Sequence, residues 1–145
     1  MAEFTYNPVQ EVVAGGNVIF NSTIPCNKGY VLHRNESGVV TLRGIVNNPC
    51  SKIARYRVQF DANIAVPEGG TPGPISVSIA IDGEAVLTSN AIVTPTVAEA
   101  YFNVVSFAII DVPAGCCYAI AVENTSNPAQ SIDVQNANLE VTRIA

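Results

Sequence analysis

The sequence predicts an all-β protein, built as a two-sheet antiparallel sandwich of about ten short strands. Its aliphatic residues include 20 valines and 14 isoleucines against 4 leucines, a bias that favours sheet because β-branched side chains pack well on a pleated surface. Nine prolines and ten glycines divide the 145 residues into segments too short for long helices. Within several of these segments, apolar residues recur at every second position.

The clearest alternation lies in residues 55–65, where Tyr56, Val58 and Phe60 are separated by polar residues. A second lies in residues 75–82 and ends at Asp82-Gly83, a pair that favours the positive φ angles of a tight hairpin turn. The expected strands are residues 17–20, 30–34, 39–46, 55–65, 75–82, 85–94, 101–112, 117–124 and 138–144.

Length and composition predict one domain, residues 1–145, since 48% of the residues are hydrophobic and 13% are charged. A jelly roll is the most economical sandwich for so many short strands. An immunoglobulin-like sandwich is the alternative, although the chain has no tryptophan to pack on a disulfide as that fold requires.

Charge and hydropathy argue against two classes of partner. The net charge of −5 disfavours nucleic acid, whose phosphates are bound by clustered lysine and arginine. No apolar run reaches the length of a membrane-spanning helix, and residues 1–10 do not resemble a secretory signal peptide. The chain is therefore expected to be made in a cytoplasm without membrane insertion.

No residue pattern predicts catalysis, a cofactor or a metal site. His33, the sole histidine, could form a dyad with Cys116 or Cys117, but a surface or hairpin position explains it better. Glycosidases need a pair of carboxylates, but the candidates in this chain are better explained by solvated strands and turns: Asp61, Asp82, Glu84 and Asp111. We therefore expect no enzyme, no catalytic residues, no cofactor and no metal.

The cysteines divide into two pairs. A hairpin formed by residues 30–34 and 39–46 would bring Cys26 opposite Cys50, which makes a disulfide feasible outside the cell. The alternative is two thiols in neighbouring loops. Cys116 and Cys117 are adjacent on an expected strand, so one should be buried and the other should lie at an interface.

Four segments carry a resemblance to a known family: RYRVQFDANIAV (55–66), SVSIAIDGEAV (76–86), DVPAGCCYAIAVEN (111–124) and ANLEVTRI (137–144). Their order resembles the C1q/TNF-like jelly roll, the head domain of trimeric collagen-like proteins, bacterial spore-surface filaments and phage virion proteins. The resemblance implies a homotrimer with the final strand inside it. We expect an aromatic set to form its interface and core: Tyr56, Phe60, Phe102, Phe107 and Tyr118.

The segments VPAGCCYAIAVENTS (112–126), VQNANLEV (134–141) and VPEGGTPGPISV (66–77) also resemble small proteins encoded near structural genes in prophages of gut Firmicutes. This implies a non-enzymatic virion decoration or fibre-head protein on the particle surface, with capsid or tail proteins as partners. The alternative is a receptor- or glycan-binding head that uses loops 66–74 and 124–130 for adhesion. Residues 1–16 contain no collagen repeat and no heptad, so we expect this segment to be an arm that contacts a partner.

Overall fold

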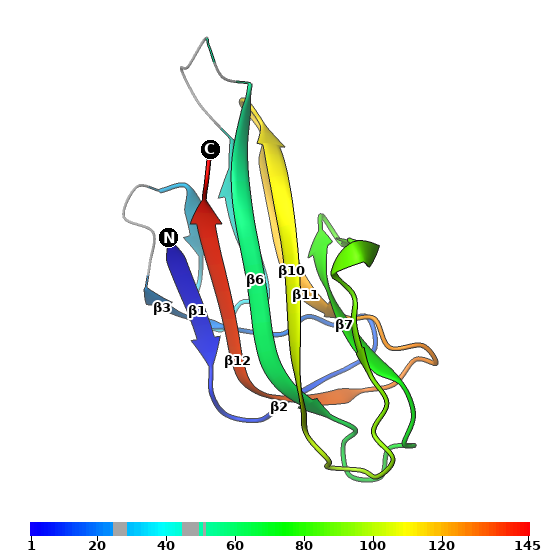
Figure 1. Ribbon diagram of the computed structural model, residues 1–145. Coiled ribbons are helices and arrows are strands. Elements are labelled where there is room, and N and C mark those ends of the chain that lie inside the picture. The colour runs from blue at the N-terminus through cyan, green and yellow to red at the C-terminus, as the bar shows by residue number, and fades with distance from the viewer. Residues whose placement is uncertain (25–28, 45–49, 51) are drawn as a thin grey trace.

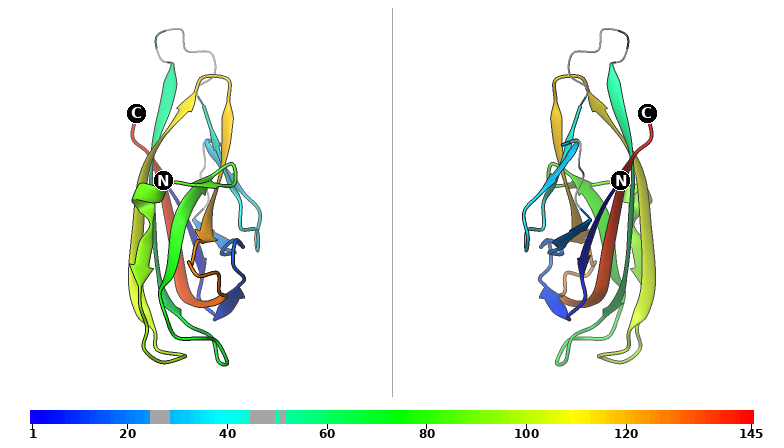
Figure 2. Two further views of the ribbon diagram at one scale, coloured as in Figure 1. Left: turned by 90° about the vertical axis from the view of Figure 1, so that its right-hand side faces the viewer. Right: turned by 90° about the vertical axis from the view of Figure 1, so that its left-hand side faces the viewer.

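A computed structural model describes residues 1–24, 29–44, 50 and 52–145. In these residues the chain forms two antiparallel six-stranded sheets packed face to face, which confirms the predicted sandwich (Figure 1). The two layers are seen separately when the molecule is turned by 90° (Figure 2). No helix in the described part of the chain is long and apolar enough to cross a membrane.

The first sheet has the strand order β10-β6-β12-β1-β3, and β2 pairs with the start of β12. Its long strands β6, β10 and β12 lie side by side along the whole sandwich. Its strands are β1 (Ala2–Tyr6), β2 (Gln10–Val12), β3 (Asn21–Ile24), β6 (Ile53–Ala65), β10 (Phe102–Pro113) and β12 (Ile132–Arg143).

The second sheet has the order β4-β5-β11-β7-β8, and β9 also pairs with β7. Its strands and the short 3-10 helix η1 are β4 (Val31–His33), β5 (Val40–Arg43), β7 (Ile75–Ile81), β8 (Glu84–Ala85), η1 (Leu87–Ser89), β9 (Ala91–Val93) and β11 (Cys117–Asn124).

The core lies between the sheets and is built from the alternating apolar residues of both. Tyr56, Phe60 and Phe20 are fully buried there, and Phe20 meets Phe60 edge to face with ring centroids 6.1 Å apart. The hydroxyl of Tyr56 donates to the backbone carbonyl of Arg43 on the opposite sheet. This bond satisfies the polar end of a buried aromatic ring and ties the two layers together.

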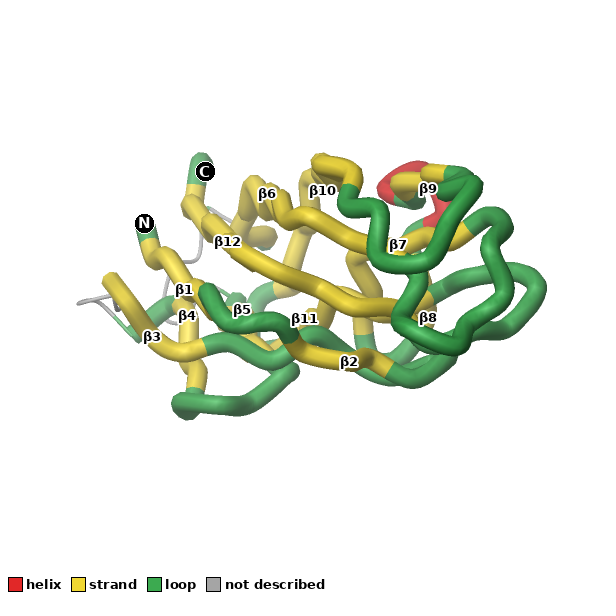
Figure 3. Tube along the Cα trace, turned by 90° about the horizontal axis from the view of Figure 1, so that it is seen from below, coloured by secondary structure: helices red, strands yellow, loops and turns green. Residues whose placement is uncertain are grey.

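The hairpin predicted at Asp82-Gly83 is confirmed. Both residues have positive φ angles, 50° and 86°, and Ala80 pairs with Ala85 across the turn. The expected strand over residues 85–94 is interrupted by η1, shown in red in Figure 3. There the Ser89 hydroxyl accepts from the backbone N–H of Ile79, so a side chain replaces the missing bond of the sheet.

The N-terminal segment differs from its predicted structure. Residues 17–20 were expected to form a strand, but Asn17 and Phe20 make only isolated bridges and the strand begins at Asn21. Residues 1–16 contribute β1 and β2, and Ala2 and Phe4 are buried. A partner of this segment would therefore meet paired strands, not a free arm.

Candidate functional site

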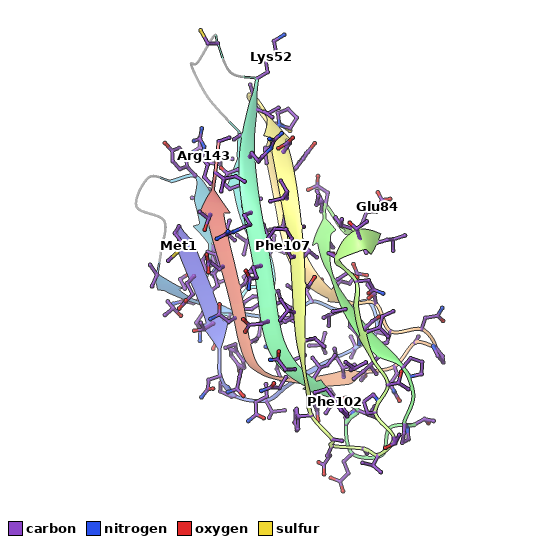
Figure 4. All side chains as sticks on the ribbon, in the orientation of Figure 1. Met1, Lys52, Glu84, Phe102, Phe107 and Arg143 are labelled. Carbon is purple, nitrogen blue, oxygen red and sulfur yellow. The ribbon has the colours of Figure 1, made fainter. Side chains whose placement is uncertain are left out.

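The outward face of β10 carries an apolar row. Val105, Phe107 and Ile109 are 55%, 48% and 47% exposed, while the residues between them, Ser106 and Ala108, are buried. Figure 4 shows Phe107 midway along this strand. We call Val105, Phe107 and Ile109 the β10 apolar row. Its position is a direct result of strand geometry, because successive side chains point to opposite faces of a sheet.

The neighbouring strand β6 presents polar side chains beside this row. Asp61 pairs with Val105, Gln59 with Phe107, and Arg57 with Ile109. The row is therefore a narrow apolar strip next to a polar one. A single outward Val or Phe is ordinary on a protein surface. Three successive outward positions of an edge strand that are all apolar indicate a contact surface.

Two ion pairs lie on the same outward face. Arg55 and Asp111 pair directly across β6 and β10, and Arg57 lies 3.5 Å from the carboxylate of Glu140 on β12. The hydrogen bond from Arg55 holds the pKa of Asp111 below its usual range. Farther along the sheet, partial burial and then the negative charge of Glu3 raise the pKa of Asp61.

The free side of β10 is partly covered by η1. The hydroxyl of Ser106 donates to the backbone carbonyl of Ser89, at the end of η1. This bond joins the edges of the two sheets and orders the strand that carries the β10 apolar row.

The aromatic residues expected at an interface or in the core occupy different places. Tyr56 and Phe60 are fully buried in the core of this chain, so neither side chain is available for contact with another protein. Phe102 and Phe107 are half-exposed on β10, where alternation directs them to opposite sides of the strand. Tyr118 is half-buried on β11 and packs against the core.

Sequence reasoning did not select Val105 and Ile109. The signal was available, because residues 104–110 are apolar at nearly every position and no core needs both faces of an edge strand. Only the packing of this sheet against the second one, which comes from the structure, shows which of these residues face outward.

His33 is not joined to a cysteine. Its Nε2 donates to the backbone carbonyl of Ser37 at 2.9 Å, and its Nδ1 lies 2.8 Å from the hydroxyl of Ser22. Both ring nitrogens are thereby engaged in positioning β4. Its ring also lies 4.6 Å from that of Phe4, as expected of a structural histidine.

Cys116 and Cys117 are both exposed, so the prediction that one would be buried is wrong. The reason is local, since Cys116 belongs to the turn before β11 and strand alternation does not apply to it. Cys50 is exposed, whereas Cys26 lies outside the described residues. The disulfide between Cys26 and Cys50 stays a prediction, and alkylation of both thiols without reduction would eliminate it.

The carboxylates considered for glycosidase chemistry lie on strands and turns of both sheets. Asp82 accepts from the backbone N–H of Ala119 at 2.9 Å, and it lines an open depression of about 470 Å³ with Glu84 and Tyr118. Asp61 and Asp111 lie on the other sheet. Within the described ranges, no group of three or more histidine, cysteine, aspartate or glutamate residues could hold a metal ion.

Comparison with solved structures establishes the fold class. The globular domain of zebrafish complement 1qA has a TM-score of 0.59 at 9% identity, covering 99% of this chain and 96% of that one. Eiger TNF from S. frugiperda has a TM-score of 0.68 at 14% identity, covering 99% and 91%. Murine APRIL has a TM-score of 0.59 at 10% identity, covering 97% and 98%.

The fold is therefore a C1q/TNF-like jelly roll, as the sequence resemblance implied. No protein-family model matches the sequence, and no curated protein is significantly similar to it. Identities this low establish a shared fold and leave function to be argued from the surface of this chain.

Proposed function

We propose that this chain is a subunit of a non-enzymatic, homotrimeric structural head. The observation that carries the proposal is the β10 apolar row, which leaves Val105, Phe107 and Ile109 about half exposed on a sheet edge. Burying these side chains against a second copy removes apolar area from water, at roughly 25 cal/mol per Å². In a closed ring of three, the apolar row of every copy is buried, and no free contact surface remains for further association.

The position of the last strand supports the same arrangement. β12 lies in the middle of the first sheet, between β6 and β1, and its outward face adjoins the polar strip of β6. In a trimer built on this sheet, the last strand would lie inside the assembly, as the family resemblance implies. The ion pair of Arg57 and Glu140 would then lie next to the subunit contact.

Light scattering on the full chain tests the trimer. We expect a mass three times the 15.3 kDa of one chain at micromolar concentration. Phe107→Glu should give a folded monomer, because it places a charge in the centre of the contact. Leu32→Glu is the matched control: Leu32 is 49% exposed on β4 of the other sheet, and this variant should stay trimeric. A monomeric wild-type chain would refute the proposal.

We further propose that the trimer is a phage or prophage virion component, as a decoration or fibre head on a capsid or tail. The support is the sequence resemblance of residues 66–77, 112–126 and 134–141 to small proteins encoded near structural genes in prophages. Its assembly would begin in the bacterial cytoplasm and end on the virion surface. Neighbouring genes for capsid or tail proteins would support this role, and a gene neighbourhood of spore-coat proteins would contradict it.

A further inference from the structure

The outward face of the second sheet carries a cluster of neutral polar side chains. Ser76 and Ser78 lie on β7, Asn90 lies between η1 and β9, and Thr125 follows β11. We call Ser76, Ser78, Asn90 and Thr125 the β7 polar cluster. Ser76 and Ser78 are buried, which is unusual for serines on the outside of a sheet.

The hydrogen bonds of the cluster fix the orientation of the Asn90 amide. Its Oδ1 accepts from the hydroxyl of Ser78 at 2.7 Å and from that of Thr125 at 2.8 Å. Because a hydroxyl has one hydrogen, Thr125 must accept in its 2.9 Å contact with Ser76. Oδ1 of Asn90 thus accepts two hydrogen bonds and has no free lone pair. The two N–H groups of the Asn90 side chain have no partner among the described residues.

A depression of about 270 Å³ lies over this cluster. Ser76, Asn90 and Thr125 supply polar atoms to its lining, and Ile92 and Pro74 supply apolar surface. Ile92 pairs directly with Ser76 across β9 and β7, so both side chains share one face, and Ile92 is 62% exposed. The depression therefore combines fixed hydrogen-bond donors with an apolar surface beside them.

A second depression, of about 340 Å³, adjoins the first through Pro74. Loop residues 71–74 and 128–130 line it, with Gln130 as its longest polar side chain. Neither lining contains a charged side chain. Glu123 lies across from Ser78 on the same face, and the chain carries a net charge of −5. Both features disfavour an anionic ligand.

We propose that these two adjoining depressions bind a neutral carbohydrate. Sugar hydroxyls would accept from the amide of Asn90 and donate to the hydroxyl oxygens of Ser76 and Thr125, whose own hydrogens are already engaged, while a C–H face of the ring rests on Ile92 and Pro74. A neutral glycan matches both halves of the site, since it presents hydroxyls on its edge and an apolar ring face. The site lies on the sheet opposite the β10 apolar row, so the inference goes beyond the structural role and does not depend on it.

NMR titration of the full chain with neutral oligosaccharides tests this site, with sialyllactose as the acidic comparator. We expect shifts at Ser76, Asn90 and Thr125 with a dissociation constant on the order of millimolar, given so small a contact. In Asn90→Asp the side chain can still accept from Ser78 and Thr125, but it has no N–H donors. This variant should bind about tenfold more weakly. Ile92→Ser should weaken it severalfold without affecting the fold, because Ile92 is exposed.

Leu32→Ser is the control for loss of an exposed apolar side chain and should leave binding unchanged. The proposal is overturned by the absence of shifts with every neutral oligosaccharide at about 50 mM. It is equally overturned by binding that survives both Asn90→Asp and Ile92→Ser, or by binding of sialyllactose alone. A failed trimer would leave this result unchanged, so the two proposals are tested separately.

Discussion

The guanidinium of Arg55 holds the carboxylate of Asp111 through two hydrogen bonds, Nε to Oδ1 at 2.7 Å and Nη2 to Oδ2 at 2.9 Å. The two residues face each other across β6 and β10. Asp111 is also the next outward residue after Ile109, so the ion pair marks the end of the β10 apolar row. Two-pronged pairs of this kind fix side-chain geometry as well as charge.

Asp111→Asn should lower the melting temperature at neutral pH and have no effect in acid. Arg55 lowers the pKa of Asp111 in the folded state, so the pair stabilises the fold above the unfolded pKa of about 4. This stabilisation is lost as the pH falls through the folded pKa. Thermal unfolding of both proteins between neutral and acid pH measures the difference. A constant difference at every pH would contradict the assignment.

Asp61→Asn should have the opposite effect on stability and stabilise the fold at neutral pH. Partial burial and the charge of Glu3 raise the pKa of Asp61, so its ionised form destabilises the folded state at neutral pH. The amide should therefore stabilise the protein by a few tenths of a kcal/mol. The gain should disappear as the pH falls through the folded pKa to below about 4, where Asp61 is protonated in both states. Denaturant unfolding at two pH values checks this, and destabilisation by Asn at neutral pH would refute it.

Two phenylalanines should separate core stability from assembly. Phe60→Ala should cost about 3–5 kcal/mol of unfolding free energy, because Phe60 is fully buried and packs on Phe20. Phe107→Ala should change the stability of a single subunit by less than about 1 kcal/mol, since its side chain faces outward. Its effect should appear in the concentration dependence of the oligomer. Equal losses of subunit stability in both variants would be inconsistent with these positions.

Two glycine substitutions should differ sharply although both add one methyl group. A Cβ on Gly44 would lie 2.1 Å from the backbone oxygen of Pro113, the last residue of β10. Gly44→Ala should therefore cost about 1–3 kcal/mol through displaced backbone. Gly73→Ala meets its nearest atom, the oxygen of Thr71, at 4.0 Å and should be nearly neutral. Chemical denaturation of both variants compares them directly, and equal effects would contradict this packing.

Local signals in the sequence determined the middle of the chain, from β6 to the hairpin after β7. Alternation identified β6 and β7, because a strand with one buried face must repeat every two residues. Asp82-Gly83 identified its hairpin, since few residue pairs tolerate two positive φ angles. These features arise from residues that are close together in the chain, so they can be predicted from the sequence.

The first sixteen residues and η1 were not predicted. β1 lies between β12 and β3, and β2 pairs with β12, so both depend on a strand more than 100 residues away. η1 depends on Ser89, whose hydroxyl replaces a backbone partner for Ile79. In β1 the alternation of Ala2, Phe4 and Tyr6 with Glu3 and Thr5 is too short to identify a strand by itself, and the contacts that stabilise β2 and η1 come from elsewhere in the fold.

The sequence by itself determined the fold class and most of the strands that form the core, because β-branched alternation can be satisfied only by burying one face of a sheet. Tertiary structure decided which apolar residues remain outside. Phe60 and Phe107 both lie within alternating strands, yet one faces the opposite sheet and the other faces solvent on an edge strand. Likewise, only the pairing of β7 with β9 and β11 brings Ser76, Asn90 and Thr125 together, since their contact arises from sheet register and not from proximity in the chain.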